Sequence, residues 1–323
     1  MVDILGIGVA LPPYRIDSKN AGELGLDASY FDKNEVRCTT LPLQYIKDTK
    51  NHTLQVKAED ILSPAKLGAE AVRLAVSNAG IELDKIGLIL GDCITPWQTT
   101  PAEAHLIGEQ LGVKIPAFDI TSSTGSFPGH VNNISNWKGE RLPEYIVSVV
   151  TNAPTQRVDY SVPSEAYSLG DGASAVVISA VHPGRYSVLS SNFSFDRKSS
   201  GLIKLPKFGH VSFLDNVAKR IFELTKEIIE KAISETGLSL NSTFVVPAQY
   251  STAVIEQVST HFNLSSDRCV NSVRDIGSNW GANSVHALQQ IDPKVNEGDK
   301  VLIVSVGPSF NCGYTLVQKR EAK

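Results

Sequence analysis

The sequence lacks several features that would assign a function directly. Its four cysteines, Cys38, Cys93, Cys269 and Cys312, show neither CxxC nor Cys/His ligand spacing, so no zinc site or disulfide framework is indicated. This cysteine usage favours a reducing cytoplasm. The apolar N-terminus is interrupted by two glycines and a proline pair, and no basic segment precedes it. It therefore predicts a buried first strand, not a signal peptide or a membrane span.

A large charge of either sign is also absent. Thirty Lys and Arg stand against 34 Asp and Glu, which gives a formal net charge of -4. No basic stripe is present that could release counterions from a phosphate backbone, so nucleic acid is not expected as a partner. The 323 residues, 42% of them hydrophobic, are enough for one large domain or two fused domains.

Common local motifs for cofactors, metals and catalytic bases are missing. The segment Gly6-Ile-Gly8 lacks the third glycine and the later acidic residue of a dinucleotide site, so it indicates a tight strand end. Neither GxxxxGK[ST] nor HExxH occurs. None of the seven histidines lies in a motif that would identify it as a base. His286 lies in a predicted helix, where we expect a packing or surface role.

Strand-like and helical patterns alternate along the chain. Such alternation predicts βαβ units around a mainly parallel sheet. The strand-like runs are Ile86–Leu90, Tyr145–Val150, Ala175–Ile178, Phe244–Val246 and Val301–Val306.

A weak internal repeat accompanies this alternation. The helical segments Ala65–Gly80 and Val217–Gly237 both end in glycine and lead through a short loop into a strand-like run. This repeated order predicts two similar halves, residues 1–183 and 184–323. The segment Cys38–Leu62 has little periodicity and predicts a long surface excursion. Long loops of this kind often cover a ligand site, although simple decoration explains it equally well.

Small hydroxyl residues gather between a short strand-like run and a helical pattern. They include Ser123 and Thr124, and Phe127 follows them. Such residues suit a nucleophile elbow, because a side chain at that junction meets the free N–H groups of the helix. A serine-rich turn that caps the helix explains the same pattern. The local sequence leaves both interpretations open.

Several motifs, in the right order, resemble the ketoacyl-acyl-carrier-protein synthase III family of the thiolase superfamily. Phe118–Phe127 resembles the FDxxxxCxGF box, with Thr124 at the cysteine. Tyr167–Ala175 is close to the LFGDGAGA box, and Ser305–Gly313 resembles FGGGFTWG. The resemblance implies the α/β thiolase fold, in which two similar βαβαβ-type halves form a layered αβαβα sandwich. Two further similar segments are Ala79–Leu90 and Thr100–Gly112.

The same resemblance implies that the catalytic triad is replaced. In the family, a cysteine takes the acyl group, and His and Asn stabilise the charge that forms as a malonyl thioester loses carbon dioxide. Val246–Ser251 resembles the PHQAN box and puts Ala248 at the histidine. Asp275–Gly281 resembles the GNTSAA box and puts Ser278 at the asparagine. A threonine hydroxyl needs a neighbouring base to act as a nucleophile, and Ala248 supplies none.

Other positions that the resemblance assigns to the site have changed as well. Pro308 replaces a glycine whose N–H helps to form the oxyanion hole, and proline has no N–H; related type III polyketide synthases carry GPG there and remain active. Thr49 replaces the arginine of the WIxxRTGI segment, so coenzyme A is not expected in the usual mode, although Tyr45 could still stack. The arm of an acyl-carrier protein stays open as a ligand. The remaining substrate-binding positions are Phe127, Asn279, Gly307 and Ser309.

Three functions are compatible with these observations. The first is a non-condensing partner subunit that pairs with an active, cysteine-containing ketosynthase homologue. The second is an acyltransferase in which Thr124 or Ser123 carries the acyl group, activated by a histidine from elsewhere. The third is a protein that binds an acyl thioester without chemistry. No cofactor is implied beyond acyl-CoA or an acyl-carrier protein as ligand, and the resemblance implies a homodimer or heterodimer.

Overall fold

The computed structural model describes residues 2–137, 142–197, 201–307 and 311–321. The α-helices are α1 (Leu43–Thr49), α2 (Pro64–Ala79), α3 (Glu103–Leu111), α4 (Ser126–Asn136), α5 (Val217–Thr236), α6 (Thr252–His261), α7 (Val273–Ile276) and α8 (Ala282–Ile291). The strands are β1 (Asp3–Ala10), β2 (Tyr14–Asp17), β3 (Val36–Thr39), β4 (Ile86–Asp92), β5 (Ala117–Asp119), β6 (Tyr145–Asn152), β7 (Gly172–Ser179), β8 (Tyr186–Phe195), β9 (Ile203–Lys204), β10 (Ser212–Phe213), β11 (Thr243–Val246), β12 (Lys300–Val306) and β13 (Asn311–Lys319).

One nine-stranded sheet organises the fold. Its strand order is β11-β12-β13-β8-β1-β7-β6-β4-β5. The first strand, β1, lies in the middle, where it pairs with β7 along its length and with β8 at Asp3 and Ile4. This confirms the prediction of a buried first strand. The five strand-like runs of the sequence are confirmed too, as β4, β6, β7, β11 and β12. The prediction of a mainly parallel sheet is wrong: in the described part of the chain β4–β5, β4–β6 and β11–β12 are parallel, whereas the other five neighbouring pairs are antiparallel.

The two repeated helices begin and end where local chemistry predicts. The Ser63 side chain accepts a hydrogen bond from the N–H of Lys66 at the start of α2, and Pro64 occupies its first turn. Gly80 ends α2 and Gly237 ends α5, each with a left-handed backbone, at φ 68° and 66°. Glycine adopts this conformation without a steric penalty, which is why the helices stop there.

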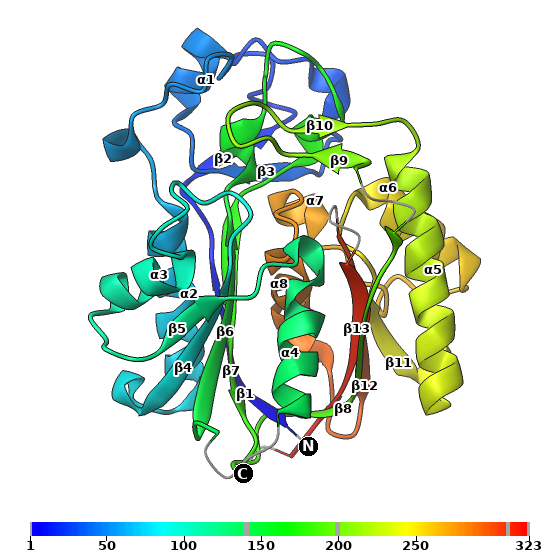
Figure 1. The fold of residues 1–323 in the computed structure, drawn as a ribbon. Coiled ribbons are helices and arrows are strands. Elements are labelled where there is room, and N and C mark those ends of the chain that lie inside the picture. Colours follow the sequence, from blue (N-terminus) through cyan, green and yellow to red (C-terminus); the bar gives the residue numbers. More distant parts are fainter. Residues whose placement is uncertain (1, 138–141, 198–200, 308–310, 322–323) are drawn as a thin grey trace.

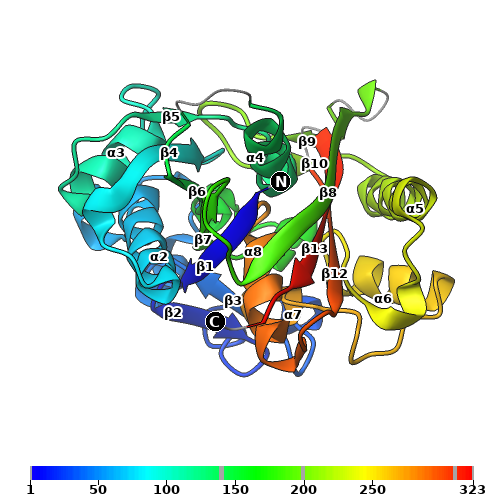
Figure 2. The same cartoon turned by 90° about the horizontal axis from the view of Figure 1, so that it is seen from below.

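The elements form five layers (Figures 1 and 2). Helices α4 and α8 lie between the β1-β7-β6-β4 part of the sheet and the β8-β13-β12-β11 part. Helices α2 and α3 cover the outer face of the first part, and α5 and α6 cover the outer face of the second. This is the αβαβα arrangement that the sequence predicts. A division into folding units at residues 183 and 184 stays a prediction.

Three buried apolar clusters match these layers. The first packs α2 and α3 on the sheet, with Val72 and Ile107 among its members. The second fills the space between the two parts of the sheet and includes Phe127 of α4 and Leu288 of α8. The third joins α5, α6, β12 and β13 to the segments above them. The middle layer is therefore solvent-excluded, and α4 is held in a fixed position within it.

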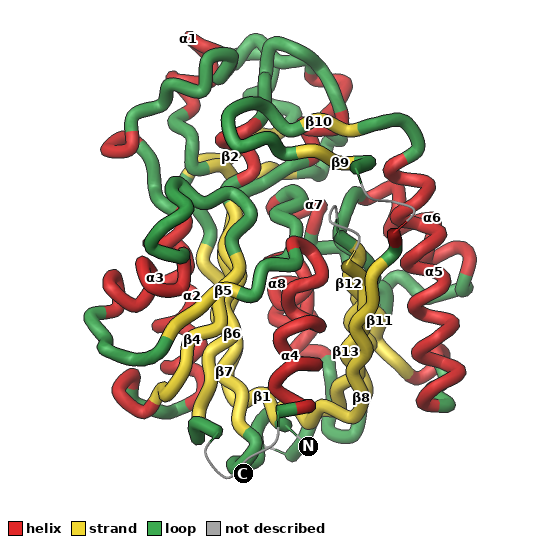
Figure 3. Tube along the Cα trace, viewed as in Figure 1, coloured by secondary structure: helices red, strands yellow, loops and turns green. Residues whose placement is uncertain are grey.

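A cap made of residues 14–62 and 201–214 lies over one end of the layers, with the paired strands β2 and β3 at its base (Figure 3). The Cys38–Leu62 excursion belongs to it and is more ordered than the sequence predicts. It contains the end of β3 and helix α1, and Leu41 and Ile46 are fully buried. In the described part of the chain, no helix is long and apolar enough to cross a membrane.

Candidate functional site

A tight turn carries Thr124 into the middle layer. The chain leaves β5 at Asp119, forms a short 3-10 helix at Ser123–Gly125 and enters α4 at Ser126. Ser123 has a φ of +55°, in the left-handed region that non-glycine residues seldom adopt. The strand-to-helix junction predicted from the hydroxyl run is therefore present, and its backbone is strained.

Asp92, at the end of β4, holds this turn. Its carboxylate accepts a hydrogen bond from the N–H of Ser122 at 2.8 Å and another from the Ser126 hydroxyl. Burial raises the pKa of Asp92 to about 8, while the turn's N–H groups act in the opposite direction. Sequence reasoning missed Asp92, because only its place at the end of a buried strand distinguishes it.

Among the described residues, no base lies beside the hydroxyls at the turn. Thr124 Oγ1 and Ser123 Oγ are buried, and no hydrogen-bond partner for either lies within the described residues. The backbone of Gly307, just after β12, lies directly against Thr124: a Cβ on Gly307 would come within 2.3 Å of Thr124 Oγ1. The structure thus brings Gly307 and Thr124 together. Pro308 and Ser309 lie outside the described residues.

The segment that carries Ser278 contacts both the loop that carries Ala248 and the turn. The Ser278 hydroxyl donates to the carbonyl of Gln249 at 2.9 Å, so it is bound to the loop that carries Ala248. Ala248 is buried. Gly281 packs on the turn itself, since an added Cβ would lie 2.5 Å from the carbonyl oxygen of Ser123. The segment that carries Ser278 therefore contacts both the Ala248 loop, through Gln249, and the turn, through Gly281.

Asn279 and the segment Tyr167–Ala175, called here the glycine-rich box, lie next to Ser278. Gly170 donates its N–H to the Ser278 carbonyl at 3.0 Å, and the Ser278 N–H donates to Ser168 at 2.8 Å. Asn279 Nδ2 lies 2.6 Å from the place of a Cβ on Gly172, which leaves no room for a side chain there. Asn279 Oδ1 is buried, with no partner among the described residues.

The aspartate of this box fastens the cap to the layers. Asp171 is fully buried and accepts hydrogen bonds from the N–H and hydroxyl groups of Thr40 and Thr155. Burial raises the pKa of Asp171 to about 6, and these hydrogen bonds limit the rise. Its role is structural, because both carboxylate oxygens are engaged.

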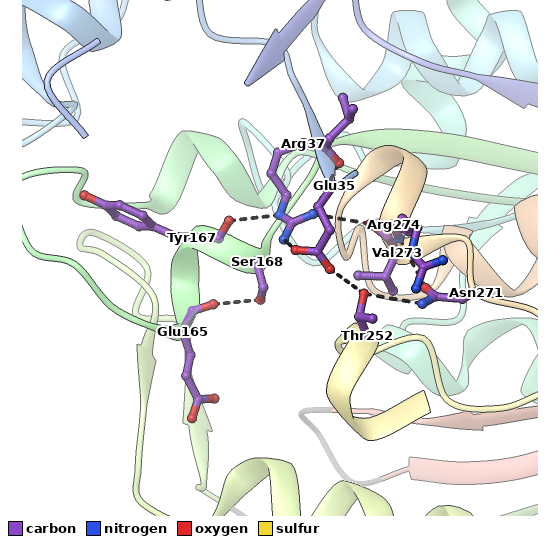
Figure 4. A network of polar contacts seen from close by, with 10 residues as sticks. Glu35, Arg37, Glu165, Tyr167, Ser168, Thr252, Asn271, Val273 and Arg274 are labelled. Atoms are coloured by element: carbon purple, nitrogen blue, oxygen red, sulfur yellow. Dashed lines mark hydrogen bonds and ion pairs between the residues drawn. The ribbon is translucent and has the colours of Figure 1, made fainter. Parts of the chain in front are cut away.

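A buried ion pair supports the other side of the site (Figure 4). Arg37 Nη2 lies 2.5 Å from Glu35 Oε2, and Arg37 Nε donates to the Tyr167 carbonyl at 3.1 Å. Thr252, at the start of α6, donates to Glu35. A Cβ on Gly277 would lie 2.8 Å from Arg37 Cδ. The pair thus joins the cap, the glycine-rich box and the segment that carries Ser278.

The structure gives packing contacts to two of the predicted binding residues. Phe127 points into the cluster between the sheet parts and is fully buried, so it is a core residue. Tyr45 lies on α1 of the cap, where its hydroxyl donates to Asn51 Oδ1 at 3.1 Å. It is half-buried against the third apolar cluster.

No histidine among the described residues is placed to activate the turn. His130 of α4 uses both ring nitrogens, one with the Ser148 hydroxyl at 2.7 Å and the other with the Ile120 carbonyl at 2.9 Å. His286 is buried on α8, as expected for a packing residue. Burial lowers the pKa of each histidine to about 4, so both are neutral near pH 7.

Two surface cavities lie away from the turn. One, of about 550 Å³, lies beside α6 and α7 and is lined in part by Glu256, Arg274 and Lys294. The other, of about 460 Å³, lies under β10 and is lined in part by Glu165 and Phe213. Among the residues that the structure describes, no group of three or more His, Cys, Asp or Glu side chains could hold a metal ion.

Comparison with known proteins gives one consistent assignment. The family described as 3-Oxoacyl-[acyl-carrier-protein (ACP)] synthase III C terminal matches residues 233–319. The beta-ketoacyl-[acyl-carrier-protein] synthase III of Neisseria meningitidis serogroup C is 27% identical over 268 residues, which cover 78% of this chain and 83% of that protein.

Solved structures agree over nearly the whole chain. The 3-oxoacyl-(acyl carrier protein) synthase III of Pseudomonas aeruginosa PAO1 superposes with a TM-score of 0.83 at 18% identity and covers 100% of this chain and 99% of that one. A tetronic acid condensing enzyme also gives a TM-score of 0.83 at 18% identity, and the match covers 98% of this chain and 100% of that one. The layered sandwich is therefore the thiolase fold. Within that fold, the chain is a ketoacyl-acyl-carrier-protein synthase III-like protein of the thiolase superfamily.

Proposed function

We propose that this protein serves acyl-thioester metabolism as a non-condensing partner subunit of an active ketosynthase. One observation carries the proposal: the turn holds hydroxyls, Ser123 Oγ and Thr124 Oγ1, that are buried and have no base within hydrogen-bond distance among the described residues. An alcohol is a poor nucleophile at neutral pH unless a base takes its proton. Acyl transfer at this turn is therefore not supported.

The other two triad positions add to this argument. Ala248 has no side chain that could bind a proton or stabilise an enolate. Ser278 has its hydroxyl engaged by the Gln249 carbonyl. Members of a catalytic unit act together, so their joint loss removes the rate enhancement almost entirely. What the site retains is the structural glycine-rich box and its contacts to the cap.

Pairing through β5 suits a partner role. This strand lies at one end of the nine-stranded sheet and pairs with β4 on one side. An edge strand presents unpaired N–H and C=O groups that a second chain can extend. Phe118 in β5 is 41% exposed, and its ring lies near that of Trp137, with the centroids 6.5 Å apart and the ring planes tilted by 46°. An apolar side chain on an open edge is what a dimer contact requires.

Co-expression with a cysteine-containing homologue tests this proposal. We expect the two chains to co-purify, and Phe118→Asp to abolish the complex. Phe208→Asp is the matched control, because Phe208 is 85% exposed but lies on the loop between β9 and β10. A homodimer that stays unchanged when the homologue is present would contradict the partner role.

An acyltransferase is the second candidate, and the strained turn is the observation that favours it. Non-glycine residues with a positive φ, such as Ser123, concentrate at functional sites. Intact-mass spectrometry after exposure to acyl-CoA and acyl-carrier protein tests it. We expect no acyl adduct; an adduct that disappears in the Ser123→Ala, Thr124→Ala double variant would establish the acyltransferase instead.

A further inference from the structure

Trp280 stands in the site at a position where a small residue is expected. The register that aligns Asp275–Gly281 with GNTSAA puts Trp280 at the serine of that box. In the structure Trp280 is 2% exposed and is the largest of the fully buried side chains. An indole thus occupies a volume that the motif leaves free.

Trp280 shares an apolar cluster with residues of the segments that carry the triad positions. Trp280 belongs to the same apolar cluster as Ala248, Tyr250 and Val306. The next residue, Gly281, packs on the Ser123 carbonyl, and the residue after Val306 is Gly307, which lies against Thr124. The segment that carries Trp280 thus contacts the turn through Gly281 and shares an apolar cluster with the Ala248 loop and the end of β12.

Two features show that stability of the core alone does not explain this tryptophan. Its backbone has a φ of +58°, which is strained for any residue but glycine. Its indole N–H is buried and has no acceptor among the described residues, although buried tryptophans usually find one. Leucine or phenylalanine would fill an apolar space without leaving a donor unsatisfied. A tryptophan here is explained by its volume.

We propose that Trp280 closes the site, because its indole fills the space beside Thr124 and Ala248 that an acyl chain would need. The inference rests on the proposed function, for which it supplies a reason: a subunit whose own site is filled leaves the acyl chain to its partner. Trp280 is then a specificity-determining residue whose effect is exclusion.

A thiol placed at the turn measures access to the site. In the Thr124→Cys variant we would follow disulfide formation with methyl and hexyl methanethiosulfonate by intact mass and peptide mapping. The new thiol should react slowly with the hexyl reagent. Adding Trp280→Ser should accelerate the hexyl reaction by about tenfold or more, and the methyl reaction by less.

Matched controls isolate the effect of the indole. Trp97→Ser in the Thr124→Cys background should leave both rates unchanged, because Trp97 is 41% exposed. The parent chain reports the reactivity of the native thiols, of which Cys269 is half-buried and the others are buried. Trp280→Phe, a smaller change in volume, should give intermediate rates if the serine variant does not fold.

Several outcomes would overturn the inference. One is an equal, fast reaction with the hexyl reagent in the Thr124→Cys single variant and in the Thr124→Cys, Trp280→Ser double variant. Another is a reaction with the hexyl reagent that stays as slow in the folded double variant as in the single variant, since an open cavity must admit the reagent. Neither result depends on co-purification with a homologue, so failure of this inference and failure of the partner role are distinguishable.

Discussion

Burial gives Asp92 an acidity far from that of an ordinary aspartate. Its carboxyl has a pKa of about 8 in the folded chain against a usual 3.8. Between these values the folded state holds more protons than the unfolded state, so the free energy of unfolding falls as pH rises. Asp92→Asn keeps an oxygen that accepts from the Ser122 N–H but cannot titrate. We expect the variant to lose less thermal stability than the wild type between pH 5 and pH 8.

Thermal unfolding followed by circular dichroism across that range measures the difference. Asp84→Asn is the control, because Asp84 is exposed and the substitution should leave the pH profile unchanged. Parallel profiles for Asp92→Asn and the wild type would show that this carboxyl does not titrate as described.

Some residues of the site could be predicted from the sequence and others could not. The family resemblance assigns Thr124, Ala248 and Ser278 to one site, and the segment that carries Ser278 contacts the Ala248 loop through Gln249 and the turn through Gly281. Asp92 was not predicted, because its contact with Ser122 joins positions 30 residues apart and no local pattern encodes it. The burial of Trp280 likewise depends on three segments that meet only in the folded chain.

At the scale of elements, β3 is held in place by the charge pair at Arg37. Burial opposes ionisation of Glu35, but Arg37 and the Thr252 hydroxyl together hold the pKa of Glu35 below its usual value. Removing one member of such a pair leaves an uncompensated buried charge. We expect Arg37→Ala to lower the free energy of unfolding by about 3 to 5 kcal/mol, and to loosen the cap first.

Urea unfolding combined with limited proteolysis of the cap tests this expectation. Arg73→Ala is the control: its partner Glu70 lies 3.8 Å away and both side chains are about half exposed, so the cost should stay below about 1 kcal/mol. Equal costs for the two variants would show that the Arg37 pair does not fasten β3.

Elements were easier to predict than the cap. Strands and helices in the layers carry strong apolar patterns and glycine stops, so α2, α5 and five strands are recognisable in the sequence. The excursion at residues 38–62 lacks periodicity because its order comes from distant contacts. Asn51, for example, is buried because its amide donates to the carbonyls of Gln156 and Val158.

We expect the middle layer to make unfolding of the whole molecule cooperative. The two parts of the sheet meet at β1 and β8 over a short stretch, where Asp3 and Ile4 are the paired residues of β1, while α4 and α8 pack against both parts. Phe127→Ala removes a fully buried ring from this shared core and should cost about 3 to 5 kcal/mol. We expect circular dichroism and tryptophan fluorescence to report the same shifted transition.

The outcome bears on the division at residues 183 and 184. Two separate transitions, with one shifted by Phe127→Ala and the other not, would support independent halves. Phe195→Ala serves as the control, because Phe195 is 57% exposed at the end of β8 and its loss should shift neither probe appreciably.

The central position of β1 also has a consequence for synthesis of the chain. Asp3 pairs with Ser179 and with Ser187, so Asp3 of β1 is synthesised more than 170 residues before either of these partners. Long sequence separation between partners slows folding and leaves strand edges open meanwhile. For most of its translation, the nascent chain therefore carries an unpaired apolar strand that a chaperone could bind.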